Sequence, residues 1–326
     1  MITWLARLHP FRTRESRRLA VLFAVVYFAQ GMWDLPTQTL TLTLKEAGLS
    51  AGQVADFTLM GTVPWLLKPL YGLLSDLVPL FGRRRTSYVI VMSGLASAAG
   101  LAVATAGHHT YWRLALGVAA MGLGLAFADV MIDALMVERG RALGVTGAFQ
   151  SVQWASIYAA VVLVGLVGGH LAERRDLHTA FALAAAFPLV TCALTAAFVR
   201  EARAPADRQA VRRTAAAIRE AARDRELWIV AGFVFFVTFS PSFGPAFLYY
   251  QTDVLHFSQR FIGGLGAVSG VGYVLGAVVY APLSRRVPLA RLVAWTIGLT
   301  AAANLAYLLY RTPAAAVAID LAYGVA

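Results

Sequence analysis

Long apolar runs separated by short polar segments divide the chain from end to end. Each run has roughly the 20 residues that a helix needs to cross the hydrocarbon core of a bilayer. Nine runs and the start of a tenth lie at 19–43, 53–75, 87–106, 111–136, 146–171, 179–199, 227–250, 260–283, 289–310 and from Pro313 onward. The first run follows a basic segment but has no small-residue cleavage site, so it is predicted to be a retained span. The pattern predicts an all-α polytopic membrane protein.

One basic segment, 200–226, interrupts the alternation of spans and short loops. Six predicted spans precede it. The sequence therefore predicts a six-helix N-terminal transmembrane bundle over 1–199, a basic cytoplasmic linker over 200–226 and a C-terminal bundle over 227–326. The C-terminal bundle contains three spans and part of a fourth, and we expect it to be truncated at Ala326.

The two halves of the chain show a faint internal repeat. Residues 49–76 resemble residues 257–284, and the first span of each half contains proline, Pro36 in one and Pro241 and Pro245 in the other. Membrane helices tolerate such breaks where the freed backbone groups face a cavity or packed protein. Broken helices at corresponding positions of two repeats predict a binding site between the halves.

Composition and charge narrow the class of protein. Hydrophobic residues make up 59% of the chain and charged residues 14%, against roughly 45–50% and 25% in soluble domains, which excludes a soluble fold. The net charge of +11 does not indicate a nucleic-acid partner, because the charges occupy short loops between spans. Of the 28 Lys and Arg residues, 21 fall on one side of the predicted topology. This asymmetry predicts a cytoplasmic N-terminus and a location in the inner or plasma membrane, with the lipid bilayer as a partner.

The chain has a single cysteine, Cys192, inside an apolar run. One cysteine cannot form an internal disulfide or a clustered cysteine metal site. We therefore expect no metal and no cofactor.

Ionisable residues inside predicted spans are candidates for function, because each costs about 2.5–3.5 kcal/mol near a helix centre. Asp129 and Asp133 lie four residues apart on one helical face, where two carboxylates disfavour joint ionisation. Together with Asp34, they are the proton-coupling candidates. The alternative for the pair is a structural role, bound to Arg139 or to another helix. Lys68 is a counter-charge for an anion or an aspartate, or a side chain that snorkels to the interface.

Polar and aromatic residues follow one face of several spans. The candidates for binding a solute are Lys68, then Gln30, Trp33 and Gln38 in the first span, Thr62 and Trp65 in the second, Gln150, Gln153, Trp154 and Tyr158 in the fifth, and Tyr249 and Tyr273 in the second half. Such stripes could equally hold helices together, and Tyr249 could belong to an interfacial aromatic belt. A cavity lined by amides, hydroxyls and aromatic rings suits a flat heteroaromatic solute.

One loop carries a distinctive motif, Gly72-Leu73-Leu74-Ser75-Asp76 followed by Gly82-Arg83-Arg84-Arg85. A helix-terminal Asp near a cluster of Arg can tie two helices together, which predicts a gating role for Gly72, Asp76, Gly82, Arg83, Arg84 and Arg85. The alternative is a plain basic topology loop. The motif resembles the loop between the second and third spans of the major facilitator superfamily. Residues 64–76 (PWLLKPLYGLLSD) and 128–139 (ADVMIDALMVER) are similar to its folate–biopterin transporter branch.

The resemblance covers the first half of the chain. It implies a major facilitator-type fold of two pseudo-symmetric six-helix bundles, the second incomplete in this chain. It also implies a monomeric secondary transporter that moves a small organic solute, folate or a pterin, by alternating access. Buried carboxylates predict that protons drive this transport as a symport. Folate has two carboxylates, which need cationic side chains as partners. Only Lys68 and Arg113 are suitably placed, so a neutral pterin is expected as much as folate.

Other functions are open at this point. The solute could be a different organic compound, such as a sugar or a muropeptide-like molecule, or the chain could be a non-transporting receptor or regulator on the same scaffold. An enzyme is not expected. An intramembrane aspartyl protease would need Asp34 and Asp129 to converge, and the sequence has no local signature of that chemistry. The lack of a phosphate-binding P-loop argues against an ATP-driven pump.

Overall fold

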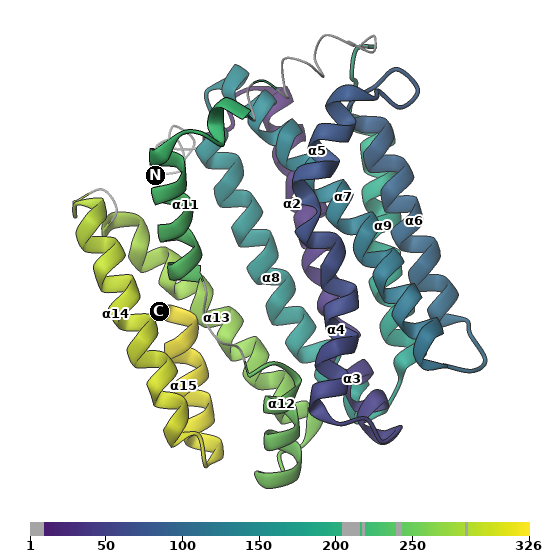
Figure 1. The fold of residues 1–326 in the computed structure, drawn as a ribbon, viewed down its shortest axis with the longest axis vertical. Coiled ribbons are helices and arrows are strands. Elements are labelled where there is room, and N and C mark those ends of the chain that lie inside the picture. The colour runs from purple at the N-terminus through teal and green to yellow at the C-terminus, as the bar shows by residue number, and fades with distance from the viewer. Residues whose placement is uncertain (1–9, 204–215, 217–218, 239–242, 284–285) are drawn as a thin grey trace, which may run out of the picture.

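The computed structural model describes residues 10–203, 216, 219–238, 243–283 and 286–326, and these residues are almost entirely helical (Figure 1). In chain order the elements are α2 (Arg14–Gly31), the 3-10 turn η1 (Met32–Asp34), α3 (Thr37–Glu46), α4 (Ala51–Leu66), α5 (Lys68–Leu77), α6 (Thr86–Ala104), α7 (Tyr111–Leu143), α8 (Thr146–Glu173), α9 (Leu177–Phe198), α11 (Arg225–Thr238), α12 (Gly244–Tyr249), the π-helical turn η2 (Tyr250–Val254), α13 (Gln259–Leu283), α14 (Leu289–Ala306), the 3-10 turn η3 (Tyr307–Leu309) and α15 (Pro313–Val325).

Short polar residues define where several of these helices begin. Thr13 caps α2 and Ser50 caps α4, each in a reciprocal capping box with the residue three positions later. These side chains satisfy backbone N–H groups that have no partner within the first turn of a helix. Helix α7 ends at Gly144, whose φ of 68° is the left-handed conformation that glycine adopts at little cost. Capping therefore sets the loop positions that the apolar runs leave undefined.

Breaks divide three of the predicted spans. The first span passes from α2 through η1 to α3, with the break directly before Pro36 as predicted. The second predicted span, 53–75, is divided at Leu67 into α4 and α5, which was not predicted. The seventh, 227–250, is divided into α11 and α12, and Pro241 lies outside the described residues. Most of the predicted linker, 200–226, also lies outside them.

The helices pack in two groups. In the N-terminal group (α2–α9), α6 lies between α7 and α9, α2 packs on α8 and α9, and α4 packs on α7. In the C-terminal group (α11–α15), α13 and α14 pack on α15. Helices α8 and α13 pack against each other and join the two groups, as Figure 1 shows.

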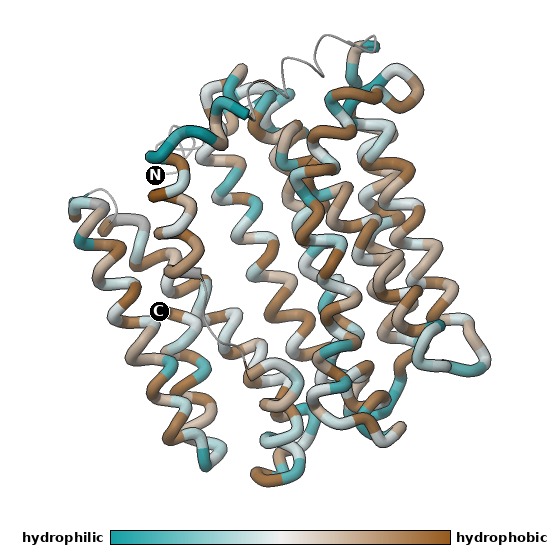
Figure 2. The backbone as a smooth tube through the Cα atoms, in the orientation of Figure 1, coloured by the Kyte–Doolittle hydropathy of each residue, from teal (hydrophilic) through white to brown (hydrophobic). Residues whose placement is uncertain are grey.

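Apolar surface covers the outside of the helices. Figure 2 shows hydrophobic segments along the helix bodies and hydrophilic ones mainly at their ends. Large apolar side chains such as Leu116 and Phe236 are exposed by 68% and 77%. Seven helical segments among the described residues are long and apolar enough to cross a membrane, with α2 to α3 taken as one. The chain is a multi-pass membrane protein, because this much exposed apolar surface is stable only in lipid.

Candidate functional site

A buried ion pair lies inside the N-terminal group. Asp129, near the middle of α7, is only 5% exposed. Its Oδ2 atom lies 2.5 Å from Nζ of Lys68, the first residue of α5, and the Gln30 side chain of α2 lies near the same carboxylate. The Lys68 ammonium also lies 4.7 Å from the centre of the Trp65 ring. The break at Leu67 therefore places a cation where it offsets the cost of the Asp129 carboxylate.

Asp133 extends this cluster by one helical turn. The Tyr27 hydroxyl of α2 donates a hydrogen bond of 2.5 Å to Asp133 Oδ1, and the Gln153 amide of α8 donates one of 3.3 Å to the same atom. Three helices thus converge on the Asp129–Asp133 pair. Arg139 is not its partner, because it lies 3.5 Å from Glu15 instead. We name Tyr27, Gln30, Lys68, Asp129, Asp133 and Gln153 the carboxylate cluster.

The charge of the carboxylate cluster is unbalanced. It contains two carboxylates and one ammonium group, so it carries one net negative charge when both aspartates are ionised. A single extra proton makes the cluster neutral. Burial favours the neutral arrangement, because an uncompensated charge in a low-dielectric interior is costly. The carboxylate cluster is therefore a candidate for binding one proton.

A cavity of about 430 Å³ lies between the two helix groups. Its lining includes Asp34, Gln38 and Thr58 from the N-terminal group, Gly165 and Gly168 of α8, and Pro245, Leu248 and Ile262 from the C-terminal group. A second hollow of about 200 Å³ adjoins it inside the N-terminal group, lined by Trp33, Phe57, Thr62 and Trp65 among others. Asp34, Thr37, Thr41 and Thr58 border both spaces, so we call them the main lobe and the aromatic lobe.

Asp34 is placed differently from the other two aspartates. It ends the η1 turn, and its side chain is exposed where it borders both lobes. Among the described residues it has no ion-pair or hydrogen-bond partner for its carboxylate. Asp34 and Asp129 do not converge, since Asp129 is held by Lys68.

The other predicted binding residues are distributed over several contacts. Gln38 lines the main lobe and donates to the backbone and side-chain oxygens of Gln259, both at 2.9 Å. Tyr158 of α8 stacks on Tyr273 of α13 with ring centres 5.2 Å apart, and Trp154 lies beside Tyr158. Neither these rings nor the exposed Gln150 line the two lobes.

Tyr249 belongs to a contact between the two groups at the end of the molecule where α3 and α12 lie. Its hydroxyl donates a 2.6 Å hydrogen bond to the Leu49 carbonyl, and Lys45 lies over its ring. Lys45 also forms an ion pair with Asp253. We call these four residues the α3-end latch.

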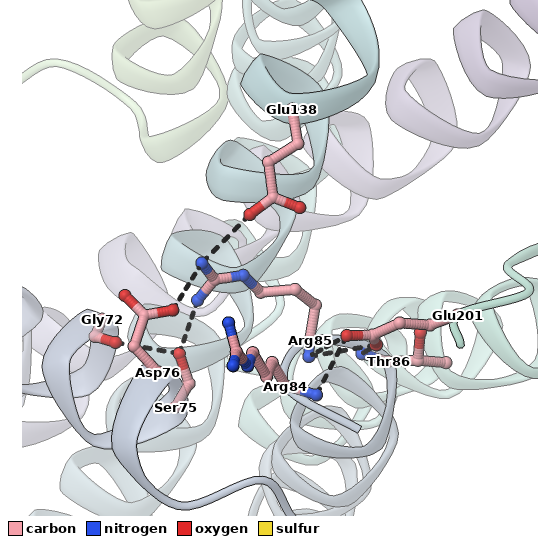
Figure 3. A network of polar contacts seen from close by, with 8 residues as sticks. All are labelled: Gly72, Ser75, Asp76, Arg84, Arg85, Thr86, Glu138 and Glu201. Carbon is pink, nitrogen blue, oxygen red and sulfur yellow. Dashed lines mark hydrogen bonds and ion pairs between the residues drawn. The ribbon is translucent and has the colours of Figure 1, made fainter. Parts of the chain in front are cut away.

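The loop before α6 forms a polar network at the opposite end (Figure 3). Only Arg85 of the three arginines is buried, at 9% exposure. Its guanidinium lies 2.6 Å from Ser75 Oγ, 2.7 Å from Asp76 and 3.1 Å from Glu138, so it joins α5, α7 and the start of α6. Arg83 is exposed, and the side-chain Nε of Arg84 is buried with no partner in the described structure. Gly82 has a φ of 75°, which allows the turn before the arginines, and Gly72 lies against Val130 of α7.

Two groups of functional interest were not predicted. Glu201, after α9, accepts hydrogen bonds from the backbone N–H groups of Arg84, Arg85 and Thr86, as Figure 3 shows. Asp320 of α15 is 6% exposed and accepts hydrogen bonds from Tyr307 at 2.7 Å and Tyr310 at 2.9 Å. Asp320 could have been predicted from the sequence, because it is a carboxylate inside the last apolar run. Nothing in the sequence pointed to Glu201.

Comparison with known proteins gives consistent matches. The model of the BT1 family matches residues 29–311. A folate-biopterin transporter from Synechocystis sp. is 32% identical over 295 residues, which cover 89% of this chain and 59% of that protein. Folate transporter 2 of Plasmodium falciparum is 23% identical over 266 residues, covering 80% of this chain and 57% of that protein. The chain thus spans less than three fifths of the length of either curated relative.

Solved structures share the fold. The D-xylose–proton symporter superposes with a TM-score of 0.62 at 16% identity, covering 94% of this chain and 78% of its own. A bacterial homolog of the human lysosomal transporter Spinster, inward-facing and unoccupied, gives a TM-score of 0.60 at 17% identity, covering 97% of this chain and 72% of its own. These matches confirm the predicted major facilitator-type fold.

Proposed function

The chain belongs to the BT1 family, and from that membership we propose that it carries a small organic solute across a membrane by alternating access. The family match confirms the resemblance noted in residues 64–76 and 128–139. The main lobe carries the proposal, because it is a cavity of about 430 Å³ between two helix groups, which is where transporters built from two repeats bind their solutes. The names of the relatives are those of transporters, which sets aside the protease alternative.

The solute we propose is a folate or pterin compound. The support is the name of the Synechocystis relative, together with the aromatic rings, hydroxyls and amide that line the two lobes. A flat heteroaromatic ring gains from stacking on Trp33 or Trp65 and from hydrogen bonds at its edge.

We place the loop that contains Arg85 on the cytoplasmic side, in accordance with the excess of arginine there. The α3-end latch then closes the outer side of the cavity. The Arg85 network ties together helices of the N-terminal group only, so that group moves as one body. Transport would open the latch and close the opposite end around the solute.

Proton coupling is proposed for the carboxylate cluster. Loading one proton neutralises its net charge, and Tyr27 and Gln153 link Asp133 to two helices that pack near the cavity. Gain or loss of that proton changes the contacts among α2, α7 and α8, which is how a bound proton could bias the two conformations. We further propose that the protein acts as a monomer.

Uptake of labelled folate and biopterin tests the proposal. The full reading frame is expressed in cells, and uptake is compared with and without an imposed proton gradient. Gradient-dependent accumulation is expected, and Asp133→Asn is expected to lower it at least 10-fold while leaving solute exchange at equal concentrations intact. Asp56→Asn, which removes an exposed carboxylate of α4 outside both lobes, is the control. Equal accumulation by Asp133→Asn would contradict proton coupling, and no uptake of either compound would contradict the solute class.

A further inference from the structure

Asp34 offers an unpaired carboxylate to a ligand. It lies at the junction of the main and aromatic lobes, and within the described residues its carboxylate has no protein partner. A carboxylate in such a place is costly unless a ligand, a proton or water satisfies it. The carboxylate cluster already contains a pair of aspartates suited to carrying the proton. Asp34 is therefore free for a separate role.

Among the described residues, three of the four threonine hydroxyls that line the two lobes are already used as donors, and that of Thr37 is the exception. Thr41 donates to the Thr37 carbonyl at 2.8 Å, Thr58 donates to the Val54 carbonyl at 2.9 Å, and Thr62 donates to the Thr58 carbonyl at 3.0 Å. Each hydroxyl has one hydrogen, so toward the lobes it presents only acceptor lone pairs. The Gln38 amide nitrogen likewise donates to Gln259.

The carboxylate of Asp34 and the acceptor lone pairs beside it favour a ligand that brings N–H donors. No Lys or Arg lines either lobe in the described part of the chain, and the ammonium of Lys68 is paired with Asp129. A ligand with carboxylates would meet the Asp34 charge without a compensating cation. A neutral ring with two adjacent N–H donors would satisfy both oxygens of Asp34 at once, as bidentate pairs with carboxylates do.

We propose that Asp34 binds the paired 2-amino and N3–H donors of a neutral 2-amino-4-oxopteridine ring, which lies in the aromatic lobe beside Trp33 and Trp65. The proposal rests on the proposed function and assigns the ring-recognising residue within the same site. The substituent at the far end of the ring extends into the main lobe. Unconjugated pterins are accordingly better ligands than folates, because no cationic side chain among the described lining residues receives the folate carboxylates.

A comparison of two ring systems tests the assignment. Pterin presents two donors at this edge, whereas lumazine (2,4-dioxopteridine) presents the N3–H donor and an acceptor oxygen at position 2. A carboxylate pairs with the first edge, and the amide of an asparagine pairs with the second. Binding to the purified full-length protein is measured by quenching of tryptophan fluorescence, which does not depend on transport. Wild-type protein is expected to bind pterin at least 10-fold more tightly than lumazine.

Asp34→Asn is expected to reverse or abolish that preference, with lumazine binding retained as proof that the variant is folded. Asp34→Glu keeps a carboxylate and is expected to keep the preference for pterin with weaker binding. Asp56→Asn is the matched control and should behave as wild type. An unchanged ratio in Asp34→Asn, or loss of both ligands, would overturn the assignment.

The wild-type result separates this assignment from the proposed function. Wild-type protein that binds neither ring removes the pterin class itself. Equal binding of both rings by wild-type protein would contradict the role of Asp34 but not the proposed transport function.

Discussion

Glu201 accepts hydrogen bonds from three successive backbone N–H groups at the start of α6, at 2.8–3.2 Å. Burial raises the pKa of this carboxyl, but the N–H donors of Thr86, Arg85 and Arg84 outweigh it, so the pKa lies below its ordinary value. A group with a lowered folded-state pKa stabilises the fold above its unfolded-state pKa, and that stability is lost as pH falls through the folded-state pKa. The contribution of Glu201 is thus present at neutral pH and is lost in acid.

Replacing Glu201 by glutamine is therefore expected to lower stability at pH 7 by about 1 kcal/mol, the usual size of a helix-capping interaction. The difference from wild type should shrink as pH falls below about 4.5, the ordinary pKa of a glutamate. Thermal unfolding of the purified protein in detergent, from pH 3.5 to 7.5, measures this. Glu220→Gln, at an exposed position, is the control. A deficit that stays constant over the whole range would show that the charge of Glu201 is not what stabilises α6.

Single residues show what the sequence can and cannot predict. The sequence identified Asp129 and Asp133 as candidate functional residues, because a carboxylate within an apolar run is energetically costly. The sequence offered Lys68 as a counter-charge for an aspartate, but not which one, and it gave no sign of the Tyr27 contact. Both contacts depend on the packing of α5 and α2 on α7. Arg139 was the near alternative by sequence, yet its side chain points to Glu15.

Close packing of α8 and α13 depends on glycine. A Cβ atom at Gly263 would lie 2.3 Å from the Gly165 carbonyl oxygen and 2.5 Å from the Gly169 Cα, which are backbone atoms that cannot rotate away. Gly263→Ala is therefore expected to force the helices apart and to destabilise the protein by about 1–3 kcal/mol, the range for overpacked sites. Gly264→Ala is the matched control, because a Cβ there meets nothing within 4 Å. Melting temperatures in detergent compare the two, and equal values would mean that the interface tolerates wider spacing.

Proline had different effects at different places along the chain. The break before Pro36 was predicted, but Pro64 lies inside α4 without ending it, and the division comes at Leu67. The freed backbone finds other partners there: the Pro64 carbonyl accepts hydrogen bonds from Leu67 N–H at 3.3 Å and from the Tyr71 hydroxyl at 2.8 Å. Such partners come from the following turn and from packing, so composition alone could not locate the break.

At the scale of the whole molecule, the sequence predicted the fold class from apolar periodicity and the loop motif. It could not predict how the two helix groups meet. Gln38, Tyr249 and Tyr273 were predicted as binding residues, and the contacts that each makes with the opposite group were not predicted, although Gln38 also lines the main lobe. Contacts between residues about 200 positions apart depend on the relative placement of two bundles, which a transporter changes during its cycle.

The α3-end latch is the feature by which that placement can be tested. Lys45 and Asp253 belong to different helix groups, so under the proposed alternating access their ion pair breaks when this end opens. The pair is partly exposed, with Asp253 54% accessible, so it is expected to contribute about 0.5–1 kcal/mol to the closed state. Asp253→Asn should then raise the population open at this end roughly 2- to 5-fold.

Reactivity of a cavity cysteine measures that population. The probe is Thr58→Cys, at a position that borders both lobes. It is introduced into a Cys192→Ser background, so that it is the only thiol of this sequence. The thiol is labelled with a maleimide that cannot cross the membrane. The labelling rate from the α3 side should rise in Asp253→Asn and return toward wild type when Lys45→Asp is combined with Asp253→Lys. Glu46→Gln is the control. Glu46 pairs with Arg175 inside the N-terminal group, so its loss breaks no contact between the two groups. If Glu46→Gln raises the rate as much as Asp253→Asn, the effect is general loosening of this end, and the ion pair between the groups does not hold it closed.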